Sequence, residues 1–153
     1  MPTYYLDASA VVKRYVSEMG SAWVQALCAN EENTLVMGET TLAEVASAFA
    51  RAARGGRISA EERLSYLDLF IGDCAESYRL VAIERTIVNS AVDLTQSHCL
   101  RGYDAIHLAT ALAMNVGLLR KQLPPLTFVS ADEDLVEAAE AEGLPTENPN
   151  LHP

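Results

Sequence analysis

Four short apolar runs alternate with longer helical stretches, and this alternation limits the folds open to the chain. The runs are Thr3–Leu6, Thr34–Met37, Arg79–Ile83 and Leu126–Val129. Short apolar runs between helices are typical of strands in a parallel sheet that is covered on both faces. Pro145–Glu147 can add a short edge strand. We therefore expect a three-layer α/β/α fold around a central, mostly parallel sheet of four to five short strands.

The size of the chain fits one domain. Its 153 residues are half hydrophobic, which is enough for one sizeable core. We expect a single domain over residues 1–148 and a polar tail over residues 149–153. The longest apolar-looking run, Ile106–Leu119, is too short and too polar to span a membrane, and the N-terminus does not resemble a secretory signal. We therefore expect a cytoplasmic protein with no membrane association.

The charge of the chain is unevenly distributed. The formal net charge is −10, which by itself disfavours a nucleic-acid substrate. Residues 132–153, however, contain seven acids and no Lys or Arg, whereas residues 1–131 contain 14 acids and 11 bases. Much of the acidity therefore belongs to a C-terminal segment, and an anionic substrate stays possible. Cys28, Cys74 and Cys99 form no CxxC pair, which predicts reduced, mostly buried thiols.

Acidic residues follow the predicted strands at similar positions. Asp7 comes directly after the first strand, Asp132 follows the end of the fourth strand closely, and Glu44 lies in the first turn of the helix after the second strand. Asp104 begins an otherwise apolar helix within the stretch LRGYDAIHLATA, Leu100–Ala111. Because ligand sites of such sheets lie beyond the carboxyl ends of the strands, we expect the four carboxylates to converge at one edge.

Taken singly, each acid has an ordinary structural explanation. Asp7 and Asp132 can cap helices, and Glu44 and Asp104 can interact with helix dipoles. Taken together, four carboxylates without a dedicated basic partner require cations. Oxygen ligands favour Mg²⁺ or Mn²⁺ over zinc, so we expect His107 to be a packing or supporting residue rather than a metal ligand.

These motifs resemble those of a known family. The Asp7–Ser9 motif DAS, the helical Glu44, RGYDAIHLATA at Arg101–Ala111 and SADEDL at Ser130–Leu135 are similar to PIN-domain ribonucleases, specifically VapC-type toxins. The resemblance implies that Asp7, Glu44, Asp104 and Asp132 are the catalytic and metal-binding acids. It also implies that Ser9 and Ser130 are supporting hydroxyls. Asp134 is a less well-spaced alternative to Asp132.

The resemblance further implies a function. A metal-activated water would hydrolyse RNA phosphodiester bonds, the protein would be a homodimer, and a cognate VapB-type antitoxin would inhibit it. Arg51, Arg54 and Arg57 surround a Gly-Gly break and are candidate RNA phosphate contacts, although an ordinary solvated helix end explains them equally well. Two alternatives stay open. One is an inactive PIN-like partner-binding domain, and the other is an acidic phosphotransfer receiver, which the lack of a late Lys disfavours.

Overall fold

The computed structural model describes residues 1–153 and has the expected three-layer architecture. Five strands form one sheet in the order β3-β2-β1-β4-β5, and every neighbouring pair is parallel. The strands are β1 (Thr3–Leu6), β2 (Thr34–Gly38), β3 (Tyr78–Val81), β4 (Thr127–Val129) and β5 (Thr146–Glu147). The edge strand near Pro145 is therefore present, as β5.

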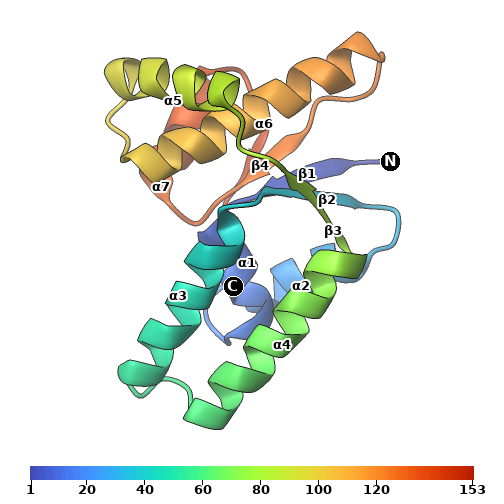
Figure 1. Ribbon diagram of the computed structural model, residues 1–153. Helices are drawn as coiled ribbons and strands as arrows, with labels where there is room; N and C mark the ends of the chain where they lie inside the picture. The colour runs from blue at the N-terminus through green and yellow to red at the C-terminus, as the bar shows by residue number, and fades with distance from the viewer.

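Seven helices cover the two faces of the sheet. They are α1 (Ala8–Tyr15), α2 (Ser21–Ala29), α3 (Thr41–Arg54), α4 (Ala60–Glu76), α5 (Arg85–Ser97), α6 (Gly102–Arg120) and α7 (Glu133–Ala141). Figure 1 shows α5, α6 and α7 on one side of the sheet and α1 to α4 on the other. Side chains alternate along each strand, so Tyr5 joins the hydrophobic cluster under α5–α7 and Leu6 joins the cluster under α1–α4.

Helix α6 is buried over only part of its length, although its apolar sequence is typical of a helix that is buried throughout. Residues 107–111 are all buried, whereas Val116 and Leu119 are exposed. The N-terminal half packs on the sheet and on α5, and the C-terminal half projects beyond the sheet (Figure 1). The half of α6 that holds Asp104 is therefore the half that packs against the rest of the protein.

Side-chain caps explain where three of the seven helices begin. Asp7 caps α1, Asp132 caps α7, and Ser59 forms a full capping box with Glu62 at the start of α4. Helix α3 has no side-chain cap: Thr40 occupies the cap position without a side-chain hydrogen bond, and the buried hydroxyl of Thr41 has no partner.

The last residues fold back onto the body of the protein. Pro149–Leu151 form a short 3₁₀ helix, η1, and the His152 ring stacks on Trp23 of α2 at a centroid distance of 4.6 Å.

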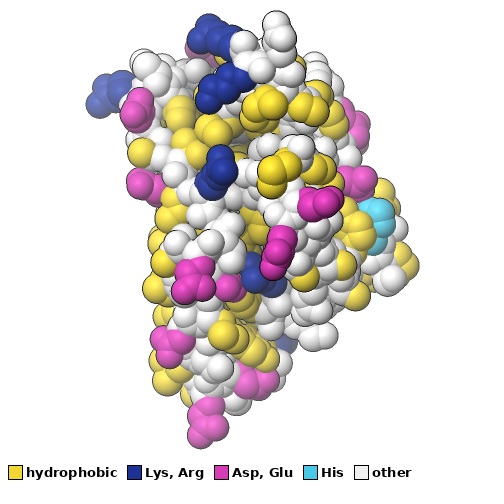
Figure 2. All heavy atoms as spheres, turned by 90° about the vertical axis from the view of Figure 1, so that its right-hand side faces the viewer, with side chains coloured by type: hydrophobic (Ala, Val, Ile, Leu, Met, Phe, Trp, Pro, Cys, Tyr) yellow, Lys and Arg dark blue, Asp and Glu magenta, His cyan; other side chains and the backbone are white.

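The three cysteines are free; Cys74 is buried, Cys28 is partly buried and Cys99 is exposed. None of the helices combines the length and the apolar character that a membrane span requires. On the face that contains the N-terminal ends of the strands, Lys and Arg gather mainly at the top and Asp and Glu are frequent at the bottom (Figure 2).

Candidate active site

A pocket of about 680 Å³ lies at the carboxyl ends of the strands, between α1, α3 and α6. All four predicted acids line it: Asp7 from the end of β1, Glu44 from α3, Asp104 from α6 and Asp132 from the cap of α7. The expected convergence of the four carboxylates on one edge is thus what the structure has. We call the end with Asp7 and Glu44 the inner end, and the end with Asp104 and Asp132 the outer end.

Asp7 is held by neutral donors. Its carboxylate oxygen Oδ1 accepts hydrogen bonds from the Ala10 amide at 3.0 Å and the Ser9 hydroxyl at 2.6 Å, and Oδ2 accepts from the Ser130 hydroxyl at 2.6 Å. These bonds use three of the roughly four lone-pair positions of a carboxylate. One position, on Oδ2, is left for a cation.

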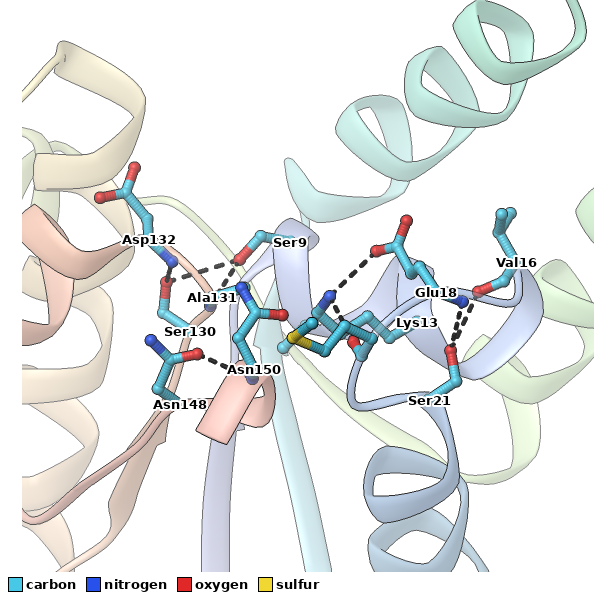
Figure 3. A network of polar contacts seen from close by, with 12 residues as sticks. Ser9, Lys13, Val16, Glu18, Ser21, Ser130, Ala131, Asp132, Asn148 and Asn150 are labelled. Atoms are coloured by element: carbon cyan, nitrogen blue, oxygen red, sulfur yellow. Dashed lines mark hydrogen bonds and ion pairs between the residues drawn. The ribbon is translucent and has the colours of Figure 1, made fainter. Parts of the chain in front are cut away.

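The two serine hydroxyls are fixed in direction. Ser9 Oγ accepts from the Ala131 amide at 2.9 Å, and Ser130 Oγ accepts from the Asp132 amide at 3.1 Å (Figure 3). Each hydroxyl proton therefore points to Asp7, and the same bonds tie the loop before α7 to the start of α1. The two residues that the sequence predicts as supporting hydroxyls both lie against Asp7.

The burial of Asp7 disfavours its charge. Asp7 is only 4% exposed, and this burial raises the pKa of its carboxyl group. The nearby His107 and the hydrogen bonds from Ser130, Ser9 and Ala10 act in the opposite direction without cancelling the effect of burial. The metal-free inner end therefore binds a proton more readily than an exposed aspartate does.

Glu44 is attached to the core through His107. Glu44 Oε1 lies 2.8 Å from His107 Nε2, and His107 Nδ1 lies 2.9 Å from the hydroxyl of Tyr5. Burial alone would lower the pKa of His107, but the hydrogen bond to Glu44 and the charges of Asp7 and Glu44 raise it. Oε2 of Glu44 has no protein partner, so it is free for a ligand in the pocket.

The outer carboxylates share one positively charged side chain, that of Arg101. This corrects the expectation that the acids have no dedicated basic partner. Arg101 Nε lies 3.2 Å from Asp104 Oδ2, and its terminal nitrogen lies 3.8 Å from Asp132 Oδ2. The Arg101 side chain is 80% exposed, so water screens both contacts. Its three-residue spacing from Asp104 on a helix start was the sequence signal for this pair.

The donor set fits a hard divalent cation, although the side chains as they lie do not close around one. All four acids offer oxygen ligands, which suit Mg²⁺ or Mn²⁺. No group of three or more His, Cys, Asp and Glu side chains gathers closely enough to hold a metal ion. Displacement of the exposed Arg101 from Asp104 and Asp132 is the simplest change that would free oxygens at the outer end.

Of the three predicted arginines and the alternative acid Asp134, only one residue lines the pocket. Arg51 lines the pocket, whereas Arg54 is exposed outside it and Arg57 lies 3.6 Å from Glu18. Asp134 is exposed in the first turn of α7 and does not line the pocket, so Asp132 is the better placed of the two acids.

Tyr103 is a pocket residue that the sequence did not single out. It is exposed and lies beside Asp104 at the start of α6. Its position directly before the acid was the available signal, because an exposed aromatic ring at a pocket rim commonly contacts a ligand. Tyr5 was also missed, since it reads as an ordinary core residue of a strand.

Comparisons with known proteins identify relatives of this chain. Residues 4–141 match the family model of the PIN domain. The chain is 37% identical over 114 residues to "Ribonuclease VapC45" of Mycobacterium tuberculosis, which covers 74% of this chain and 78% of that protein.

Solved structures share the fold at low sequence identity. The protein PAE2754 from Pyrobaculum aerophilum superposes with a TM-score of 0.65 at 19% identity, covering 95% of this chain and 83% of that one. VapC20 of Mycobacterium tuberculosis, described as a sarcin-ricin loop cleaving toxin, superposes with a TM-score of 0.61 at 13% identity, covering 92% and 95%. The family match and the VapC relative together show that this chain belongs to the PIN-domain family, as a VapC-type member.

Proposed function

We propose that this protein is a divalent-metal-dependent endoribonuclease and the toxin of a toxin–antitoxin pair. The observation that carries the proposal is the convergence of Asp7, Glu44, Asp104 and Asp132 on one pocket. Membership of the VapC-type PIN proteins supports ribonuclease activity, because the relative with 37% identity is named a ribonuclease. Neither serine of the pocket, Ser9 or Ser47, contacts a His or Lys that could act as its general base, and no Cys lines the pocket, which favours attack by water.

The four carboxylates would hold Mg²⁺ or Mn²⁺. When bound, the cation supplies activation of a water molecule and compensation of the charge that develops at the phosphorus centre. Ser9 and Ser130 hold the buried Asp7 carboxylate in place from two sides. Arg101 pairs with the outer acids and, once released from them, has a mobile guanidinium that can contact a phosphate.

One side of α3 would carry the RNA backbone. Thr40, Ala43, Glu44, Ser47, Ala48 and Arg51 line the pocket at helical spacing. The small residues in the middle leave room along the helix, and Arg51 provides a positive charge about two turns from Glu44. Across the pocket, the exposed ring of Tyr103 is available to stack on a base. Arg54 and Arg57 extend the positive charge beyond the pocket as more peripheral contacts.

The proposed partners follow from the same family membership. A VapB-type antitoxin would inhibit the protein, and two copies of the chain would form a homodimer in the cytoplasm. The similar structures include chains from VapBC2 of Rickettsia felis and from a toxin–antitoxin complex of Klebsiella pneumoniae. Their likeness to this chain is one of fold, so the antitoxin remains part of the proposal.

Two other functions fit the site less well. An inactive partner-binding domain would not need all four carboxylates in one pocket. A phosphotransfer receiver would need an accessible acceptor Asp with a nearby Lys, but Asp7 is buried and hydrogen-bonded, and no Lys lines the pocket.

The test is incubation of the purified protein with structured RNAs in Mg²⁺, in Mn²⁺ and in EDTA. We expect cleavage with either metal, none in EDTA, and loss of cleavage in Asp104→Asn, which removes one charge at nearly constant size. Cleavage that persists in EDTA, or that is undiminished in the variant, would contradict the proposal.

A further inference from the structure

His107 and Tyr5 form a hydrogen-bonded chain that ends on a carboxylate of the pocket. The Tyr5 hydroxyl contacts His107 Nδ1 at 2.9 Å, and His107 Nε2 contacts Glu44 Oε1 at 2.8 Å. Tyr5 is completely buried and His107 is 2% exposed, whereas the Glu44 carboxylate is at the pocket wall. The chain therefore runs from the rigid core of the protein to the inner end of the pocket.

The chemistry of the three groups fixes the direction of both bonds. A carboxylate only accepts hydrogen bonds, so His107 Nε2 must carry a hydrogen that it donates to Glu44. In a neutral imidazole, Nδ1 is then an acceptor, and the Tyr5 hydroxyl must be its donor. A phenol can also accept a bond from Nδ1–H, so Tyr5 supports the same Nε2–H contact in either charge state of the ring.

The position of the Tyr5 ring is determined by packing on three sides. The ring stacks on Phe128 at a centroid distance of 5.5 Å and meets the His107 ring edge-on at 5.9 Å. Gly38, at the end of β2, leaves room for the hydroxyl, because a Cβ atom there would lie 3.3 Å from it. The hydroxyl that orients His107 is thus placed by the sheet itself.

We propose that His107 is a positioning residue that holds the Glu44 carboxylate toward the pocket, and that the buried Tyr5 hydroxyl sets the orientation of His107 for this purpose. The inference rests on the proposed function, because it assigns the two residues a role in cation binding by Glu44. Groups that orient a metal-binding side chain affect metal affinity without touching the metal, and their removal commonly weakens binding ten- to a hundredfold. Neither residue was identified as a ligand, and neither needs to be one.

The test compares two tyrosines that are both buried. Tyr5→Phe removes the hydroxyl on His107 and keeps the stacked ring. The matched control is Tyr78→Phe, which removes a hydroxyl that accepts from Arg14 at 3.0 Å in the other hydrophobic cluster. Thermal melts of each full-length protein at a series of Mn²⁺ concentrations give an apparent Kd, because the stabilisation grows with the logarithm of 1 + [Mn²⁺]/Kd. We expect this apparent Kd to rise about tenfold in Tyr5→Phe and to be unchanged in Tyr78→Phe.

A second pair of variants separates positioning from packing. His107→Gln keeps an N–H donor that can reach Glu44, whereas His107→Leu keeps a similar volume without a donor. We expect Gln to retain most of the Mn²⁺ affinity and Leu to lose more of it than Tyr5→Phe does. If the wild type responds to Mn²⁺ and Tyr5→Phe responds equally, the inference is wrong and the proposed function stands. If the wild type does not respond to Mn²⁺, the proposed function is wrong and the inference falls with it.

Discussion

The inner and outer ends of the pocket hold their carboxylates by different means. At the inner end, buried neutral donors surround Asp7, and His107 contacts Glu44 from the core. At the outer end, one exposed arginine bridges Asp104 and Asp132. Buried hydrogen bonds fix a side chain, whereas an exposed ion pair is worth little and is easily exchanged. Under the proposed function, we therefore expect the inner end to be preorganised and the outer end to adjust when a cation or a phosphate binds.

The largest expected effect comes from the inner end. Asp7→Asn keeps a helix cap at α1 but removes the buried charge, so it should lower metal-dependent RNA cleavage by at least about 100-fold, or about 2.7 kcal/mol in the activation barrier. Single-turnover cleavage assays with excess Mn²⁺ measure this. Wild-type cleavage by the Asn variant would show that Asp7 is only a cap.

The outer end should respond in the opposite direction. Arg101→Ala removes the cation that competes for Asp104 and Asp132, so we expect Mn²⁺ to bind more tightly, by up to about fivefold, since an exposed ion pair contributes at most about 1 kcal/mol. Mn²⁺ titrations followed by thermal melting measure the change, with Arg120→Ala at the far end of α6 as the control. Weaker Mn²⁺ binding in Arg101→Ala would mean that this side chain supports the metal-ready arrangement.

The pH dependence of stability separates the two ends further. Burial raises the pKa of Asp7, and interactions with Glu44 and Asp7 raise that of His107, so the folded protein binds protons more strongly than the unfolded chain at both residues. The stability that these protons provide is complete below the unfolded pKa values and is lost as the pH rises through the folded ones. Metal-free wild type should therefore lose stability toward alkaline pH.

Asp7→Asn isolates the Asp7 part of this effect. In EDTA the variant should melt above the wild type at pH 8, and the difference should shrink as the pH falls, because Asp7 then becomes neutral in the wild type as well. A pKa raised by one unit in the folded state corresponds to about 1.4 kcal/mol in the free energy of unfolding. For a chain of this size, that is a shift of roughly 3 °C in the melting temperature. Asp68→Asn, on the exposed surface of α4, controls for the lower net charge. Equal stabilisation by both variants would assign the effect to net charge.

The smallest expected effect concerns the RNA phosphates. Arg51 lines the pocket and Arg54, one turn further along α3, does not. Arg51→Ala should make the dependence of log affinity on log salt shallower by about 0.7, the value for one phosphate contact on a single strand. Arg54→Ala should change this slope less. The measurement is RNA binding by the Asp104→Asn protein at several salt concentrations, and equal slopes for both variants would remove Arg51 from the interface.

The sequence predicts that the acids meet because the parallel topology brings their elements together. The carboxyl ends of parallel strands meet at one edge and β1 pairs with β4, so Asp7 and Asp132 follow neighbouring strand ends. The partners of these acids were harder to predict. An exposed residue such as Arg101 can pair in many directions, and the contact between Tyr5 and His107 joins residues 102 positions apart. The solvent exposure of the C-terminal half of α6 was not predicted, because its apolar residues are typical of a buried helix.

The central claim is that the four carboxylates act together in binding divalent metal, and thermal melting tests it without any knowledge of the substrate. Wild type, Asp7→Asn and Asp104→Asn would be melted in EDTA and in excess Mg²⁺ or Mn²⁺. We expect the metal to raise the melting temperature of the wild type, and we expect a smaller rise in both variants. Identical metal responses in all three proteins would show that these acids are structural and would contradict the claim.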